Sequence, residues 1–188
     1  MAGKGVVQTT NVLYAKTFSF MSLTDDLENG SLVAKGKLID GEREIYEALK
    51  PDAGALEGEL YLVANPAWSY DDSKATSQNE DEYVIPKGTA FRVYLLTKGN
   101  KYAITDYSLT GAVVKDNLVT GAAGSYKGVA AIPSSVTVED YGFVGEIELI
   151  DDYGYFYPIG QFGVSGGTLG TGIDTRGKMI VINVVKNG

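Results

Sequence analysis

Short runs of β-branched and aromatic residues recur along this chain, and most of them are bounded by glycine, proline or asparagine. Runs of this kind, with apolar and polar positions in alternation, predict β-strands. The predicted strands cover residues 12–20, 32–39, 60–64, 89–96, 101–105, 117–120, 126–132, 143–150, 153–159 and 178–186. About ten short strands with at most one short helix predict a mainly β fold, a compact β-barrel or β-sandwich.

Two turn signals predict how neighbouring strands are connected. Asn29-Gly30 is the commonest signal for a tight hairpin turn, so we expect a hairpin around residues 28–31. Lys98-Gly99-Asn100 lies between the runs 89–96 and 101–105, which we expect to form a second hairpin.

One segment, residues 41–50, fits both a helix and a strand. Asp40 is a suitable N-cap, Glu42 and Glu44 favour the positive end of a helix, and Pro51 would end it. The same residues also alternate well enough for a strand. The pattern alone leaves both open.

The chain is expected to form one domain with a leading arm. Residues 1–11 are small and polar, which predicts a flexible N-terminal arm, and residues 12–188 follow as a single β-rich domain, with a subdivision near 110–125 as an alternative. The polar stretch 71–82 and the glycine-rich stretch 160–177 are interpreted as long loops.

The amino-acid composition limits which side chains are available for catalysis and metal binding. The 188 residues include no histidine and no cysteine, but 13 tyrosines and 24 glycines. Histidine-dependent acid/base catalysis, thiolate nucleophiles and the usual zinc ligands are therefore excluded. A net charge of -8 argues against a nucleic-acid partner. The longest apolar run, 179–185, is far too short to span a membrane, so a soluble protein made in the cytoplasm is expected.

Acidic pairs are the remaining catalytic candidates. Glu146 and Glu148 fall on one face of a predicted strand, and Asp151-Asp152 precede several aromatic residues, as in a glycoside hydrolase site. The favoured interpretation is structural: the two glutamates face solvent, Ile147 and Leu149 face the core, and Asp151-Asp152 occupy a turn. We assign no catalytic residue, no metal ligand and no cofactor, and expect that the protein is not an enzyme.

Aromatic residues suggest surfaces for binding. If they are exposed, these aromatic side chains would supply rigid amphipathic contact area, and if they are buried they would belong to the core. The residues are Trp68, Tyr70, Tyr155 and Tyr157. A carbohydrate-binding β-sandwich is one alternative function on this basis, and a paired-carboxylate glycoside hydrolase is a weaker one.

Four stretches together carry a resemblance to a known group of proteins. They are 29–33, 41–48, 62–66 with Tyr70-Asp71, and 85–94. They resemble the small structural proteins encoded beside the major capsid protein in tailed phages of Gram-positive hosts, over roughly residues 10–110.

The resemblance implies a head decoration, or cement, protein. Such a protein would be made in the host cytoplasm, bind the major capsid protein on the outer surface of the virion and stabilise the shell, often as a trimer. The expected partner-binding residues belong to the arm and to the aromatic set: Lys4, Val6, Val7, Thr9, Asn11, Trp68, Tyr70, Tyr155 and Tyr157.

Overall fold

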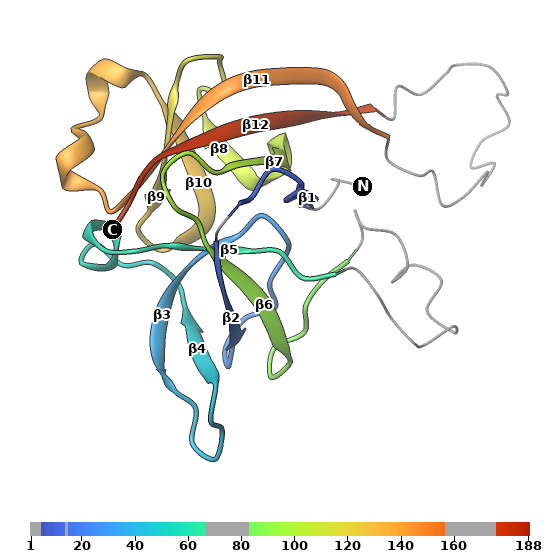
Figure 1. The fold of residues 1–188 in the computed structure, drawn as a ribbon, viewed down its shortest axis with the longest axis vertical. Coiled ribbons are helices and arrows are strands. Elements are labelled where there is room, and N and C mark those ends of the chain that lie inside the picture. Colours follow the sequence, from blue (N-terminus) through green and yellow to red (C-terminus); the bar gives the residue numbers. More distant parts are fainter. Residues whose placement is uncertain (1–4, 14, 67–82, 157–175) are drawn as a thin grey trace, which may run out of the picture.

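A computed structural model describes residues 5–13, 15–66, 83–156 and 176–188 of the chain. The described residues form twelve strands in two sheets, which confirms the predicted mainly β fold, and their helical segments are single 3₁₀ turns (Figure 1). The strands are β1 (Val7–Gln8), β2 (Lys16–Met21), β3 (Leu32–Leu38), β4 (Ile45–Leu49), β5 (Tyr61–Val63), β6 (Ala90–Leu95), β7 (Lys101–Thr105), β8 (Leu109–Gly111), β9 (Leu118–Ala122), β10 (Ser125–Ala131), β11 (Phe143–Phe156) and β12 (Arg176–Asn187). The 3₁₀ turns are η1 (Ala55–Glu57), η4 (Asp106–Ser108), η5 (Pro133–Ser135) and η6 (Val138–Asp140).

Five of these strands close into a barrel in the order β2-β4-β3-β5-β6. Strand β2 closes it, because it pairs in parallel with β4 and antiparallel with β6. The barrel is filled by a buried cluster that includes Phe20, Val33, Tyr61, Phe91 and Val93. The ring of Phe20 lies 5.0 Å from that of Tyr61, so aromatic packing contributes to this interior.

The other seven strands form an open sheet in the order β1-β7-β12-β11-β9-β10-β8. Its longest pairing joins β11 to β12, which run antiparallel from Phe143 opposite Asn187 to Phe156 opposite Arg176. Figure 1 shows these two strands as a ribbon across the top of the molecule, above the barrel.

The barrel and the sheet share a core through β3 and β5. Leu32 and Leu62 belong to the cluster that contains the sheet residues Ile147 and Ile180, whereas Val33 belongs to the barrel interior. Alternate side chains of β3 and β5 therefore point to opposite faces, and both faces are buried. This explains why Leu32-Val33-Ala34 is continuously apolar rather than alternating with polar residues.

Residues 41–50 contain a strand and no helix. Ile45–Leu49 is β4, which pairs antiparallel with β3 and parallel with β2. Gly41 has a φ of +85°, a conformation that suits glycine in the turn between β3 and β4. β3 directly precedes β4, whereas β2 is a more distant segment that reaches β4 only in the folded barrel, so this choice depended in part on tertiary pairing.

Both predicted hairpins are wrong, although the turns are present. Gly30 has a φ of +82°, but β3 then pairs with β5 while Leu27 bridges to Ile85. The turn at Gly99 likewise does not fold β7 back on β6, because β6 belongs to the barrel and β7 to the sheet. The chain therefore crosses from the barrel to the sheet at this turn. The buried Asn100 stabilises the turn, because its side chain accepts a hydrogen bond from the Leu13 amide and donates one to Thr97.

Strand β11 covers both predicted strands at 143–150 and 153–159, as far as Phe156. Asp151 and Asp152 therefore lie within a strand and not in a turn. The register shifts between Ile147 and Leu149, so Ile147 is buried but Leu149 is 52% exposed, contrary to the expectation that both face the core. A bulge of this kind changes which face the following residue occupies.

The described part of the N-terminal arm, residues 5–11, lies along the sheet. Strand β1 pairs antiparallel with β7, and the Thr105 side chain accepts a hydrogen bond from the Val6 amide. The Val6 side chain is buried. From β1 onwards the chain thus passes from the sheet into the barrel, which it forms from β2 to β6, and returns to the sheet at β7.

Candidate functional site

The expected partner-binding residues are only partly described. Lys4, Trp68, Tyr70 and Tyr157 lie outside the described residues, and so do the acidic stretch 71–82 and the glycine-rich stretch up to residue 175. Tyr155 lies in β11 opposite Gly177.

The structure brings three of the expected arm residues together. Val6, Val7 and Thr9 line a small pocket of about 180 Å³, whose other wall includes Asn65 and Arg92. Asn11, two residues after Thr9, is exposed. Val6 is 2% exposed and contributes to the core.

The wall opposite the arm is held by a reciprocal amide pair. Asn29 donates a side-chain hydrogen bond to the Asn65 carbonyl, and the Asn65 amide N–H donates to the Asn29 side chain at 2.8 Å. The Asn65 side chain in turn donates to the hydroxyl of Tyr83. Because these groups satisfy one another, this pocket has a rigid polar wall.

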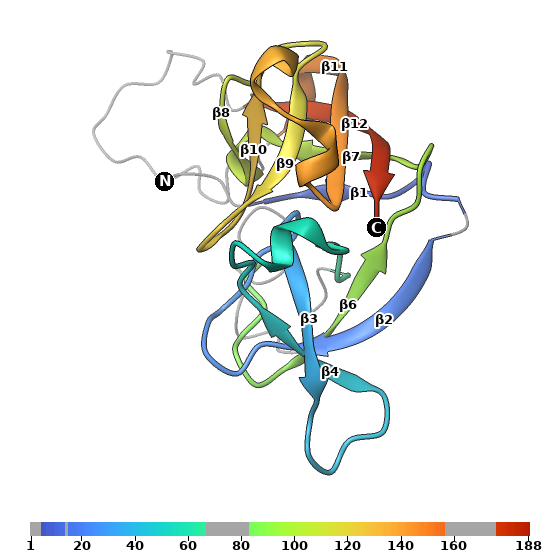
Figure 2. The same cartoon turned by 90° about the vertical axis from the view of Figure 1, so that its left-hand side faces the viewer.

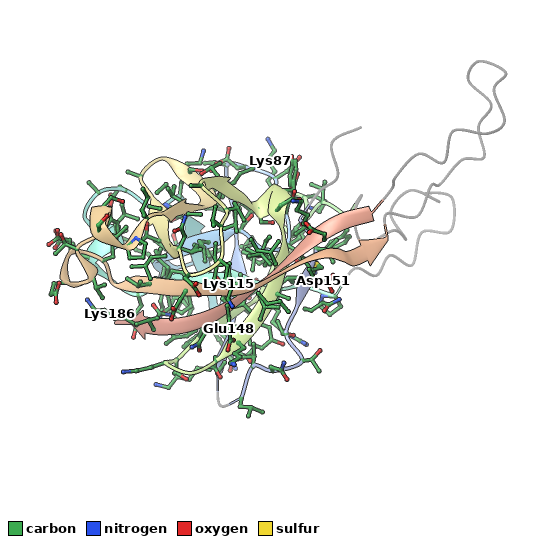
Figure 3. The ribbon with its side chains drawn as sticks, turned by 90° about the horizontal axis from the view of Figure 1, so that it is seen from above. Lys87, Lys115, Glu148, Asp151 and Lys186 are labelled. Carbon is green, nitrogen blue, oxygen red and sulfur yellow. The ribbon has the colours of Figure 1, made fainter. Side chains whose placement is uncertain are left out.

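Two of the candidate acids, Glu148 and Asp152, each lie beside a lysine. Lys101 Nζ donates to Glu148 Oε1 at 2.7 Å, and Lys178 Nζ lies 3.0 Å from Asp152 Oδ1. Figure 3 shows Glu148 and Asp151 at separate points along the β11–β12 ribbon. Within the described ranges no group of three or more acidic side chains is placed to hold a metal ion.

A larger pocket of about 330 Å³ lies where the barrel meets the sheet, and we call it the junction pocket. It is formed by four segments that are distant in the sequence: the loop before β3, the residue after β4, the turn η4, and the turn that leads into β10. Its lining residues are Asp26, Leu27, Glu28, Asn29, Gly30, Ser31, Lys50, Tyr107, Ser108, Gly124, Ser125, Tyr126 and Lys127.

Two lysines of the junction pocket are each positioned over a tyrosine ring. Lys127 Nζ lies 3.8 Å from the ring centre of Tyr107, and Lys50 Nζ lies 4.9 Å from that of Tyr126. Cation–π contacts at these distances favour one position of a long, flexible side chain. The pocket thus has two ammonium groups held near aromatic surfaces.

A hydrogen bond beside the junction pocket joins the barrel to the sheet. Tyr126 Oη donates to Asp25 Oδ2 at 2.9 Å, and Lys50 Nζ lies 3.5 Å from the same oxygen. Partial burial of the phenol, together with its bond to this carboxylate, raises the pKa of Tyr126 to about 12. The hydrogen bond from Tyr126 and the charge of Lys50 lower the pKa of Asp25.

Sequence reasoning did not identify the residues of the junction pocket. Lys50 and Lys127 are ordinary surface lysines in the sequence, and Tyr107 and Tyr126 are two of 13 tyrosines. The Asn29-Gly30 turn lies in one wall, but its sequence pattern indicated only a turn. The other walls are set by contacts between the barrel and the sheet, which no local pattern encodes.

No helix in the described part of the chain is long and apolar enough to cross a membrane. Comparison of the chain with protein-family models, with curated proteins and with solved structures finds no match.

Proposed function

We propose that this protein is a head decoration protein, which binds the outer surface of a tailed-phage capsid and stabilises the shell. The main support is where the four stretches that carry the sequence resemblance lie. Their described parts all belong to the barrel: 29–33 enters β3, 41–48 forms the following turn and most of β4, 62–66 includes the end of β5, and 85–94 leads into and covers most of β6. The described residues that carry the resemblance thus belong to one structural unit, the barrel.

The hairpin of β3 and β4 supplies a surface for the capsid. Strand β3 pairs with β5 only at Leu32 and Val33, so residues 36–44 extend beyond the rest of the barrel. Figures 1 and 2 show this hairpin projecting from the bottom of the molecule. A projecting hairpin can reach a partner surface without disturbing either core.

The hairpin presents an exposed apolar side chain among charged ones. Leu38 is 45% exposed in β3, and charged side chains of both signs surround it in the sequence. The exposed charged residues are Lys35, Lys37, Asp40, Glu42, Arg43 and Glu44. An apolar centre with a polar rim is the usual anatomy of a protein interface. In this proposal the partner is the major capsid protein, and the protein acts without catalysis.

Trimer formation and location on the virion belong to the same proposal. Both are implied by the resemblance, and synthesis in the host cytoplasm would precede assembly onto the capsid. Several copies around one junction between capsomers would add their separate contacts, so a weak individual contact would suffice.

Co-sedimentation with purified expanded capsids that lack the protein tests the proposal. The unmodified protein should pellet with the capsids and raise their resistance to heat, and Leu38→Glu should weaken this binding about tenfold or more, because a charge would replace the apolar centre. Val114→Glu is the matched control, since Val114 is 57% exposed and lies after β8, outside the barrel. Failure of the unmodified protein to bind expanded capsids would reject the function. Equal binding by the two folded variants would reject the hairpin as the contact surface.

A further inference from the structure

We propose that the junction pocket binds a saccharide that carries a carboxylate, with a uronic acid as the simplest example. The inference concerns a second site and does not depend on capsid binding.

The lining carries two acids, Asp26 and Glu28, and two lysines, Lys50 and Lys127, and it is Lys127 that favours an anionic group on the ligand. The two acids of its lining already accept hydrogen bonds: Asp26 from the Lys87 amide at 2.9 Å, and Glu28 from the Gly5 amide at 3.4 Å. Lys127 has no carboxylate within ion-pair distance among the residues that the structure describes. A ligand carboxylate beside Lys127 would gain a charge-assisted hydrogen bond at a cation that lacks one.

Lys50 differs from Lys127 because it shares the carboxylate of Asp25 with Tyr126. Its charge is therefore partly balanced within the protein. We assign the ligand carboxylate to Lys127, and expect Lys50 to contribute a weaker interaction with ligand hydroxyl groups.

The remaining lining groups suit the body of a sugar ring. Lysines cover one face of the Tyr107 and Tyr126 rings, and the rest of each ring provides aromatic surface that can contact the C–H groups of a pyranose. Ser31 and Ser125 provide hydroxyl groups, which can both donate and accept hydrogen bonds as sugar hydroxyls do.

The size of the pocket agrees with a small ligand. Its volume of about 330 Å³ is at the lower end of the range for small-molecule sites. The walls come from both the barrel and the sheet, and sites at such boundaries are common. The Tyr126–Asp25 hydrogen bond fixes the two walls relative to each other.

Two sugars that differ only at one carbon test the inference. Methyl glucuronide carries a carboxylate where methyl glucoside carries a hydroxymethyl group, and acetate supplies a carboxylate without a ring. Titrations followed by amide NMR should show that the glucuronide shifts the signals of Tyr107, Ser125 and Lys127. It should bind about tenfold more tightly than either comparison ligand, since only it uses both the charge and the ring contacts.

Variants locate the site. Lys127→Gln should weaken glucuronide binding about tenfold, because it removes the unpaired charge, and Lys127→Arg should retain binding. Lys98→Gln is the matched control, since Lys98 is an exposed lysine in the turn between β6 and β7, outside the pocket. The inference is overturned if the glucuronide causes no shifts, if the glucoside or acetate binds as tightly, or if the folded Lys127→Gln protein binds like the unmodified one. None of these results would bear on capsid binding, which is measured with a different variant and assay.

Discussion

Tyr126 and Asp25 are 101 positions apart in the sequence, and a 2.9 Å hydrogen bond joins them. Tyr126 belongs to β10 of the sheet, whereas Asp25 lies in the connection that leaves β2 of the barrel. The same carboxylate oxygen is approached by Lys50 at 3.5 Å. This polar contact supplements the apolar core that the two sheets share, and it lies at the edge of the junction pocket.

We predict that Tyr126→Phe and Asp25→Ala destabilise the protein non-additively. Either change removes the same hydrogen bond, so the double variant should be little less stable than the worse of the two single variants. Urea unfolding of the four proteins gives the coupling energy directly.

Tyr107→Phe is the control for this cycle. The Tyr107 ring contacts Lys127, but its hydroxyl makes no hydrogen bond with the described residues. The Tyr107→Phe change should therefore leave the free energy of unfolding nearly unchanged. Full additivity of the Tyr126 and Asp25 variants would show that the contact contributes nothing in solution.

A second prediction concerns alkaline pH. The pKa values of Tyr61 and Tyr126 are raised from 10.0 to about 12, in both cases chiefly by burial. The unfolded chain therefore releases these protons at lower pH than the folded protein. The contribution of the two tyrosines to stability should be constant below about pH 10 and fall as the pH rises from 10 to 12. Thermal unfolding across this range measures the loss.

Tyr126→Phe should make the alkaline decline shallower, because one of the titrating groups is gone. At acidic pH the sign is reversed: the pKa of Asp25 is lowered from 3.8, so its contribution is present at neutral pH and is lost as the pH falls below that value. An unchanged alkaline slope in Tyr126→Phe would contradict the assignment of a raised pKa to this tyrosine.

A third prediction concerns Tyr102, which is buried in the core beneath the sheet. Its hydroxyl has no hydrogen-bond partner among the described residues, and burial raises its pKa well above the usual value. Removing an unsatisfied buried hydroxyl removes a desolvation penalty of about 1 to 3 kcal/mol. Tyr102→Phe should therefore leave the free energy of unfolding unchanged or increase it. If the free energy of unfolding fell by more than about 1 kcal/mol in urea unfolding, the hydroxyl would be shown to make a hydrogen bond in solution.

A fourth prediction tests whether the N-terminal arm is part of the fold. Val6 is 2% exposed, so Val6→Ala removes buried apolar surface and should cost about 1 to 2 kcal/mol in urea unfolding. Val114→Ala, at a side chain that is 57% exposed, should change stability by less than about 0.5 kcal/mol. If both variants had the same small effect, the arm would be detached from the sheet in solution.

Local patterns in the sequence determined most of the strands. The alternation in 101–105 and the apolar residues 32–34 at the start of β3 were sufficient, because a strand's preference for branched and aromatic residues is expressed within a few positions. Composition also determined, without any structure, that histidine and cysteine chemistry is absent from this chain.

Tertiary structure decided how those strands are assembled. Residues 45–49 became a strand because β2 and β3 lie on either side of them, and the turn at Gly99 became a crossing between sheets because β7 pairs with β12. The junction pocket is the same kind of outcome, since Lys50 and Lys127 meet only after the barrel packs on the sheet. The physical reason is one of range. Strand propensity acts over a few neighbouring residues. Strand partners and pocket walls are instead selected by burial and hydrogen bonding between segments far apart in the chain.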